Sequence, residues 1–168
     1  MKLGSGHAAF EREDPPARCT ADNLTTSRAA ADGRAAADGA AAEGFAAGTV
    51  VYLDVERVED VSPELRAYVR GWFDTVLADT RYVPGLYAHA DNADALMAEA
   101  RAAFGAAGLD DSPRLWVAST GGFNLRRGPG ESGFDAEVWQ GLLDVTETWG
   151  GHALRIDANV AADASPSR

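Results

Sequence analysis

The stretch from Gly48 to Glu56, GTVVYLDVE, constrains the fold more than any other part of the sequence. Side chains alternate between the two faces of a strand, so this stretch predicts one strand with two different faces. The polar face would carry Tyr52, Asp54 and Glu56. The opposite face would be wholly aliphatic, with Val51, Leu53 and Val55. Acids at the carboxyl end of a buried strand favour an α/β sheet with chemistry at that edge, although such acids also simply face water or cap a turn.

Composition narrows the classes of protein to which the chain can belong. It has 168 residues, 46% of them hydrophobic, which suits one domain with a core. A formal net charge of −11 argues against nucleic acid as a partner. The single cysteine, Cys19, excludes an intrachain disulfide, and no Cys/His spacing predicts a metal site.

The sequence predicts no cofactor and no membrane partner. The glycines between Gly121 and Gly133 do not form a phosphate-binding loop between a strand and a helix. No apolar run approaches the ~18 residues of a membrane span. The N-terminus lacks the apolar segment of a signal peptide, so the sequence leaves the compartment unknown.

A direct repeat precedes the acidic strand, since RAAADG occurs twice in residues 28–39. Alanine favours helix, whereas Gly33 and Gly39 each cost about 1 kcal/mol there. The repeat therefore predicts a thin, weakly anchored helix that ends near Gly44, or low-complexity sequence without a role. The charged and proline-bearing residues 1–27 predict a disordered or unrelated tail.

Two stronger helices are predicted after the acidic strand. Ser62 and Pro63 are a favourable N-cap and first helical residue. Large apolar residues follow at helical spacing, which predicts a helix packed on the sheet: Leu65, Tyr68, Val69, Trp72, Phe73, Val76 and Leu77. The next helix is predicted to begin at Asp91 or Asn92 and to stop at Gly108.

Four further segments have the pattern of strands, namely 83–88, 114–118, 136–140 and 153–157. Strands that alternate with helices predict a parallel sheet. The predicted fold class is therefore α/β, with about five parallel strands in one domain over residues 28–160. Residues 161–168 are predicted to be a frayed polar tail.

The order of short motifs along the chain resembles the second half of a glycoside-hydrolase-like TIM barrel. These motifs are Asp54-Val55-Glu56, Gly85-Leu86-Tyr87, Leu115-Trp116-Val117-Ala118, Trp139-Gln140 and Ile156-Asp157-Ala158-Asn159. The chain resembles the family 25 lysozyme-type muramidases and, more closely, a related bacterial glycoside-hydrolase-like family of poorly defined function. The resemblance covers roughly residues 32–160.

The resemblance implies a partial (β/α)8 barrel in which strands four to eight are recognisable. The acidic strand would be strand four, and Asp157 would end strand eight. The first three strands of a barrel are not visible before Gly48, so the barrel is expected to be N-terminally incomplete or truncated. Such a sheet leaves two open edges, which predicts an open, strongly twisted and marginally stable partial barrel and a possible edge-paired dimer.

The resemblance also implies the site. Glu56 would be the acid/base residue, with Asp54 and Asp157 in support. The predicted substrate-binding residues are Tyr52, Tyr87, Trp116, Trp139, Gln140 and Asn159, although the aromatic ones also suit barrel packing and Asn159 a turn cap. His89 could serve as a base or be an ordinary polar residue.

A glycosidic bond is hydrolysed by one protonated carboxyl group and a second carboxylate, which these acids could supply. The predicted function is therefore a glycosidase that acts on bacterial cell-wall peptidoglycan or another polysaccharide. Two alternatives stay open: a catalytically inactive glycan-binding module, and a truncated remnant without a function of its own.

Overall fold

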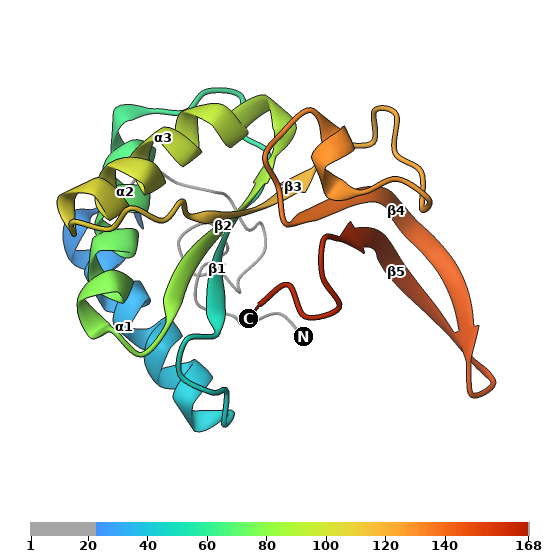
Figure 1. The fold of residues 1–168 in the computed structure, drawn as a ribbon, viewed down its shortest axis with the longest axis horizontal. Helices are drawn as coiled ribbons and strands as arrows, with labels where there is room; N and C mark the ends of the chain where they lie inside the picture. The colour runs from blue at the N-terminus through green and yellow to red at the C-terminus, as the bar shows by residue number, and fades with distance from the viewer. Residues whose placement is uncertain (1–22, 168) are drawn as a thin grey trace.

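The computed structural model describes residues 23–167, which form one α/β unit with a single curled sheet (Figure 1). In chain order the elements are α1 (Thr26–Ala42), β1 (Val50–Val55), α2 (Pro63–Asp79), β2 (Val83–His89), α3 (Ala90–Ala106), β3 (Arg114–Ala118), η3 (Pro129–Ser132), β4 (Val138–Trp149) and β5 (His152–Ala161). Most of the tail predicted over residues 1–27 lies outside the described residues. None of the helices between residues 23 and 167 is long and apolar enough to cross a membrane.

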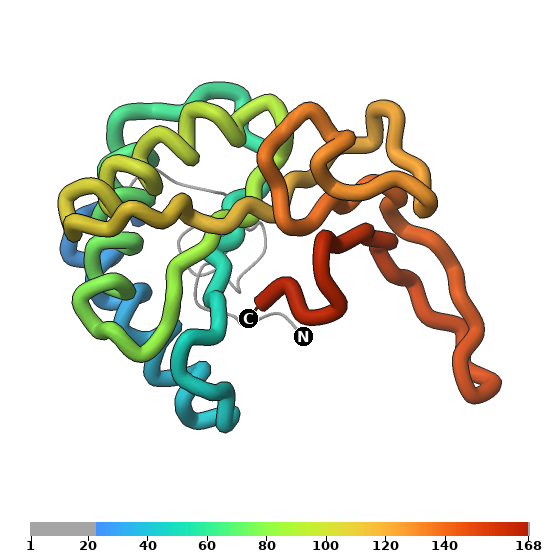
Figure 2. Tube along the Cα trace, in the orientation of Figure 1, coloured from blue at the N-terminus to red at the C-terminus, as the bar shows by residue number. Residues whose placement is uncertain are grey.

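The sheet has the order β1-β2-β3-β4-β5, and β1 to β4 are parallel. The last pair is different, because β4 and β5 are antiparallel. The prediction of five parallel strands was therefore wrong for β5. The strands are antiparallel because only Gly150 and Gly151 connect β4 to β5, whereas a connection between parallel strands needs a dozen or more residues. The sheet curls through part of a barrel, while its strand numbers in a complete barrel stay a prediction (Figures 1 and 2).

The three helices pack as one layer against the outer face of β1 to β3 (Figure 1). The buried core lies between the helices and the sheet and includes the aliphatic face of β1 and the apolar stripe of α2. The predicted cap of α2 is confirmed, since the Ser62 hydroxyl accepts a hydrogen bond from the Leu65 N–H at 3.2 Å.

The start of α3 differs from its prediction. The N-cap is His89, whose Nδ1 accepts a hydrogen bond from the Asp91 N–H at 3.2 Å. Strand β2 runs directly into α3 without a loop, so its last residue becomes the cap. Asn92 instead accepts a hydrogen bond from the Val58 N–H and donates one to the Val58 carbonyl, both at 3.1 Å. The loop after β1 is thereby tied to α3.

Helix α1 is anchored more firmly than its small side chains predicted. Gly33 lies so close to α2 that a Cβ atom there would be 3.0 Å from the Thr75 Cβ. Asp32 is 5% exposed and accepts hydrogen bonds from the Tyr68 hydroxyl at 2.6 Å and the Arg28 Nε at 2.9 Å. Close backbone approach and a buried, satisfied carboxylate therefore hold α1 on α2.

The C-terminal half has two features outside the regular α/β pattern, a projecting ribbon and a segment that returns to β1. The segment Leu142–Ile156, called the arm below, projects from the rest of the molecule as a two-stranded ribbon (Figures 1 and 2). After β5 the chain turns back to β1, where the Val50 N–H donates to the Ser167 carbonyl at 2.8 Å. The Tyr52 hydroxyl donates to the Pro166 carbonyl at 3.2 Å. The edge of β1 predicted to be open is therefore covered at its beginning.

Candidate functional site

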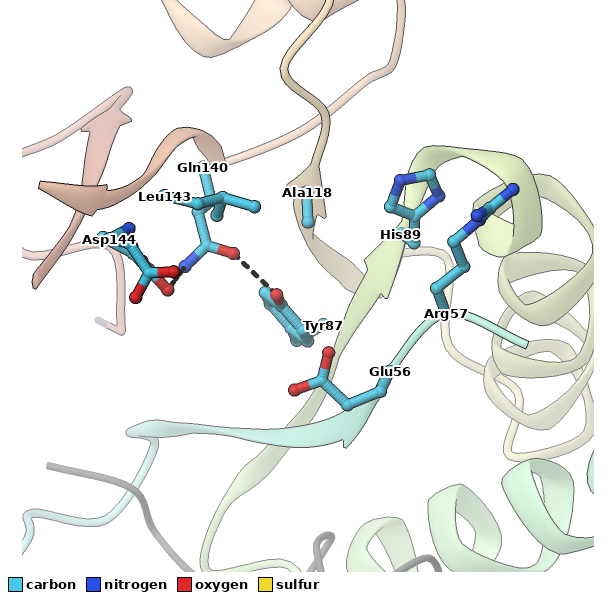
Figure 3. A pocket seen from close by; sticks show the side chains of 9 residues that line it. Glu56, Arg57, Tyr87, His89, Ala118, Gln140, Leu143 and Asp144 are labelled. Carbon is cyan, nitrogen blue, oxygen red and sulfur yellow. Dashed lines mark hydrogen bonds between the residues drawn. The ribbon is translucent and has the colours of Figure 1, made fainter. Parts of the chain in front are cut away.

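A cavity of about 410 Å³ lies at the carboxyl ends of the strands. Strands β1 to β3 contribute from their last residues or from the segment that follows, whereas β4 contributes from its first half and β5 from its middle (Figure 3). The lining residues are Glu56, Arg57, Tyr87, His89, Ala118, Gln140, Leu143, Asp144 and Asp157. Parallel strands bring their carboxyl ends to one edge, which is where α/β folds place ligands.

A chain of hydrogen bonds crosses the cavity from β2 to β5 (Figure 3). The Tyr87 hydroxyl donates to the Gln140 Oε1 at 2.6 Å, and the Gln140 Nε2 donates to the Asp157 Oδ2 at 3.3 Å. The Asp144 N–H donates to the other oxygen, Oδ1, at 2.9 Å. Because a carboxylate only accepts, the amide of Gln140 must present its NH2 group to Asp157 and its oxygen to Tyr87. The chain therefore fixes the orientation of every group in it.

The three predicted acids lie around Tyr87. Burial raises the pKa of Tyr87, and the negative charges of Glu56, Asp54 and Asp157 raise it further, in that order. Asp54 is the register neighbour of Tyr87 on β1, and Glu56 follows the end of that strand. Figure 3 shows the side chains of Glu56 and Tyr87 in the same part of the cavity. The structure thus brings together Asp54 and Glu56, which the strand pattern indicated, and Asp157, which the family resemblance implied.

Three of the predicted aromatic and polar residues lie on the inner face of the sheet without lining the cavity. The ring of Trp116 meets the rings of Tyr52 and Tyr87 edge to face, with centroids 5.8 and 5.5 Å apart. The Trp116 indole N–H donates to the Asn159 Oδ1 at 3.0 Å, and the Asn159 Nδ2 donates to the Asp157 carbonyl at 2.9 Å. Tyr52, Trp116 and Asn159 therefore support the cavity from its floor.

Trp139 lies on the opposite face of the sheet. Its side chain is 0% exposed, packs edge to face on Phe123 and donates its indole N–H to the Ser119 carbonyl at 2.7 Å. Neighbouring residues of a strand point to opposite faces, so Trp139 and Gln140 cannot both face the cavity. Gln140 lines the cavity, whereas Trp139 lies in the core, where no part of its side chain is accessible to a ligand.

Two charged lining residues were missed by the sequence reasoning. Arg57 lies directly after Glu56, and its Nε donates to the Asp91 Oδ2 at 2.9 Å. Asp144 has a positive φ of 56° at an irregularity in β4, and its carboxylate pairs with the Arg155 Nη2 at 2.8 Å. Arg57 could have been found as the next residue beyond the strand end. Asp144 could not, since an interrupted alternation has no sequence signal. Across residues 23–167, no three His, Cys, Asp or Glu side chains gather where they could hold a metal ion.

A curled α/β sheet with acids gathered at one edge is an arrangement that a glycoside hydrolase-like domain can have. Comparison with protein families gives the particular one: residues 14–161 match the Rv2525c-like, glycoside hydrolase-like domain, and the chain belongs to this family. No curated protein matches the sequence.

A solved structure with a similar fold is the spore cortex lytic enzyme SleM of Clostridium perfringens. It superposes with a TM-score of 0.51 at 18% sequence identity, and the match covers 82% of this chain. It covers 46% of SleM, so this chain spans less than half the length of that enzyme. At this identity the likeness shows a common fold.

Proposed function

We propose that this chain acts on polysaccharide of the bacterial cell wall, as a glycosidase that uses carboxyl groups as acid and base. The observation that carries the proposal is the gathering of Asp54, Glu56 and Asp157 around Tyr87 at the carboxyl edge of the sheet. Membership in a glycoside hydrolase-like family supports the reaction class. The fold shared with a cortex lytic enzyme supports peptidoglycan as the substrate.

In the proposed reaction Glu56 donates its proton to the glycosidic oxygen while the bond from that oxygen to the anomeric carbon breaks. A fixed carboxylate stabilises the positive charge that develops on the sugar. Water then adds its hydroxyl group to the anomeric carbon and gives its other proton to the Glu56 carboxylate, which acts as the base and is restored to its acid form. Asp157 suits the stabilising role because hydrogen bonds from Gln140 and Asp144 hold it in place. Asp54 lies beside Tyr87 and supports Glu56.

The proposed sugar contacts come from the hydrogen-bond chain and the residues below it. Tyr87 and Gln140 would meet sugar hydroxyl groups, since both line the cavity. Tyr52, Trp116 and Asn159 would act from the floor by keeping Tyr87 and Asp157 in position. Trp139 contributes through the core alone.

The test is the release of reducing ends from peptidoglycan and from chitin-like polymers. We expect the Glu56→Gln variant to lose at least about 100-fold in rate, the usual contribution of a general acid. Glu59→Gln is the matched control, because Glu59 is an exposed glutamate of the same loop that does not line the cavity. A folded wild type without activity, or equal activity in wild type and Glu56→Gln, would remove the proposal.

A second candidate function is glycan binding without cleavage. Both carboxylate oxygens of Asp157 accept hydrogen bonds from the protein, and a carboxylate fixed in this way can hold a sugar without taking part in cleavage. Titration of oligosaccharides against tryptophan fluorescence tests this candidate. Saturable binding by a wild type that releases no reducing ends would favour it, and the absence of any change at millimolar ligand would exclude it.

A further inference from the structure

The apolar face of the sheet continues onto the arm. Trp139 pairs with Val160 on the core side of β4 and β5, and residues two apart on a strand share a face. The alternate residues of β5 beyond Val160 therefore lie on this core side, together with the β4 residues paired with them. Within the arm this apolar face consists of Leu142, Val145, Glu147, Trp149, His152, Leu154 and Ile156.

This apolar face is not covered within the described residues. Trp149 is 66% exposed, Leu154 48%, Leu142 42% and Ile156 37%. In the body the same side of the sheet is packed, since Trp139 is 0% exposed. Large exposed apolar side chains gathered on one face of a ribbon are typical of an interaction site.

The opposite face of the arm has a different chemistry. It carries Thr146, Thr148, Ala153 and Arg155, and it leads to Asp157 in the cavity. Arg155 is paired there with Asp144 at 2.8 Å. Most of the large apolar side chains of the arm thus lie on one face of a ribbon that is exposed on both, and Leu143, which lines the cavity, is the exception. The apolar face can be covered without blocking the cavity.

We propose that the apolar face of the arm packs against the same face of a second copy of this chain, related by a two-fold axis. The distribution of charge favours contact between two copies at the arm over contact between their bodies. The formal net charge of the chain is −11, but the arm contributes only −1, from Asp144, Glu147 and Arg155. Because the arm projects from the body, two arms meet while the acidic bodies stay apart (Figures 1 and 2).

The face is also self-complementary, as a two-fold interface must be. Its apolar residues can pack against the same residues of a second copy without repulsion between like charges. Its two titratable side chains are one carboxylate, Glu147, and one imidazole, His152, in adjacent rows of opposite strands. A two-fold partner therefore supplies an imidazole for each carboxylate.

The test is the mass of the full chain in solution, measured by sedimentation over a hundredfold range of concentration. We expect a dimer in the wild type, and a dissociation constant at least about tenfold higher for Leu154→Glu. Thr146→Glu is the matched control, because it adds the same charge to the opposite face of the arm and should leave the dimer intact. The emission of Trp149 should shift to the blue with dimerisation in the wild type and in the control.

Ile156→Thr is a milder second variant that keeps a β-branched residue in the strand and should also weaken the dimer. Circular dichroism checks that each variant is folded. A wild type that is monomeric at every concentration overturns the proposal, as would be the case if another part of the same chain covered the face. A dimer that survives both face substitutions, as an edge-paired dimer would, also overturns it.

Discussion

Tyr52 and Tyr87, on the inner face of the sheet, hold their protons to higher pH than tyrosine in an unfolded chain. Burial raises the pKa of Tyr52 to about 12, and the charge of Glu137 adds to the rise while Arg114 opposes it. Burial also raises the pKa of Tyr87, together with the charges of the three site acids. Because the ordinary value is about 10, the folded protein binds more protons than the unfolded chain above that pH.

This difference predicts a loss of stability at alkaline pH. The contribution of Tyr52 is complete below about pH 10 and is lost as the pH rises through about 12. The free energy of unfolding should therefore fall with pH in this range, and less steeply in Tyr52→Phe and Tyr87→Phe. Urea denaturation at several pH values above about 9 measures the slope. Slopes that are identical in the wild type and both variants would contradict the assignment.

At single positions, the sequence predicted those site residues whose side-chain direction follows from simple alternation. Asp54 and Tyr87 lie where the period of two places them, on the inner face of regular strands. Trp139 does not, because it and Gln140 are neighbours in one strand and only one of them can face the cavity. Asp144 was missed because the irregularities between Gln140 and Val145 change the face that each later residue of β4 presents.

Among the elements, helix α1 offers a test with an internal control, since its two glycines have opposite surroundings. A Cβ atom at Gly33 would lie 3.0 Å from the Thr75 Cβ and 3.2 Å from the Trp72 carbonyl oxygen, whereas one at Gly39 meets nothing within 4 Å. We expect Gly33→Ala to destabilise the protein by about 1–3 kcal/mol through overpacking. Gly39→Ala should stabilise it by about 0.5–1 kcal/mol, because alanine loses less backbone entropy in a helix.

Urea denaturation of the two variants measures both changes. Equal effects of the two substitutions would show that α1 is not held by close approach to α2. A Gly39→Ala variant with unchanged stability would indicate instead that the end of the helix frays in solution.

The elements that the sequence predicted well are those in which apolar residues recur without interruption at the spacing of a strand or a helix. Strands β1 to β3 and helices α2 and α3 have uninterrupted apolar patterns, and each was found within a few residues of its predicted bounds. Strand β4 was predicted to end at Gln140 but continues to Trp149. The register shifts between Gln140 and Val145 interrupt its alternation, and its second half is exposed on both faces, so no continuous pattern links that half to the predicted strand.

At the scale of the whole molecule, the segment Pro166–Ser167 joins the end of the described chain to its first strand. It accepts hydrogen bonds from the Val50 N–H at 2.8 Å and from the Tyr52 hydroxyl at 3.2 Å. We expect removal of residues 163–168 to lower the free energy of unfolding by about 1–3 kcal/mol, since the two hydrogen bonds to Pro166 and Ser167 are lost. Hydrogen exchange at the Val50 amide should become faster.

The substitution Asp163→Ala is the control for this deletion, because Asp163 is exposed and lies before the contact. It should leave exchange at Val50 unchanged. Unchanged exchange after the deletion itself would show that this contact is not maintained in solution.

The order of the strands has a consequence for synthesis of the chain. Spatial order and chain order are the same from β1 to β5, so each strand can join its neighbour as soon as it leaves the ribosome. The Val50 amide is an exception, because its acceptor on Ser167 is translated after every strand. On a translating ribosome the free edge of β1 is thus exposed longest. It is there that a nascent chain offers its backbone to other chains, until Pro166 and Ser167 cover it.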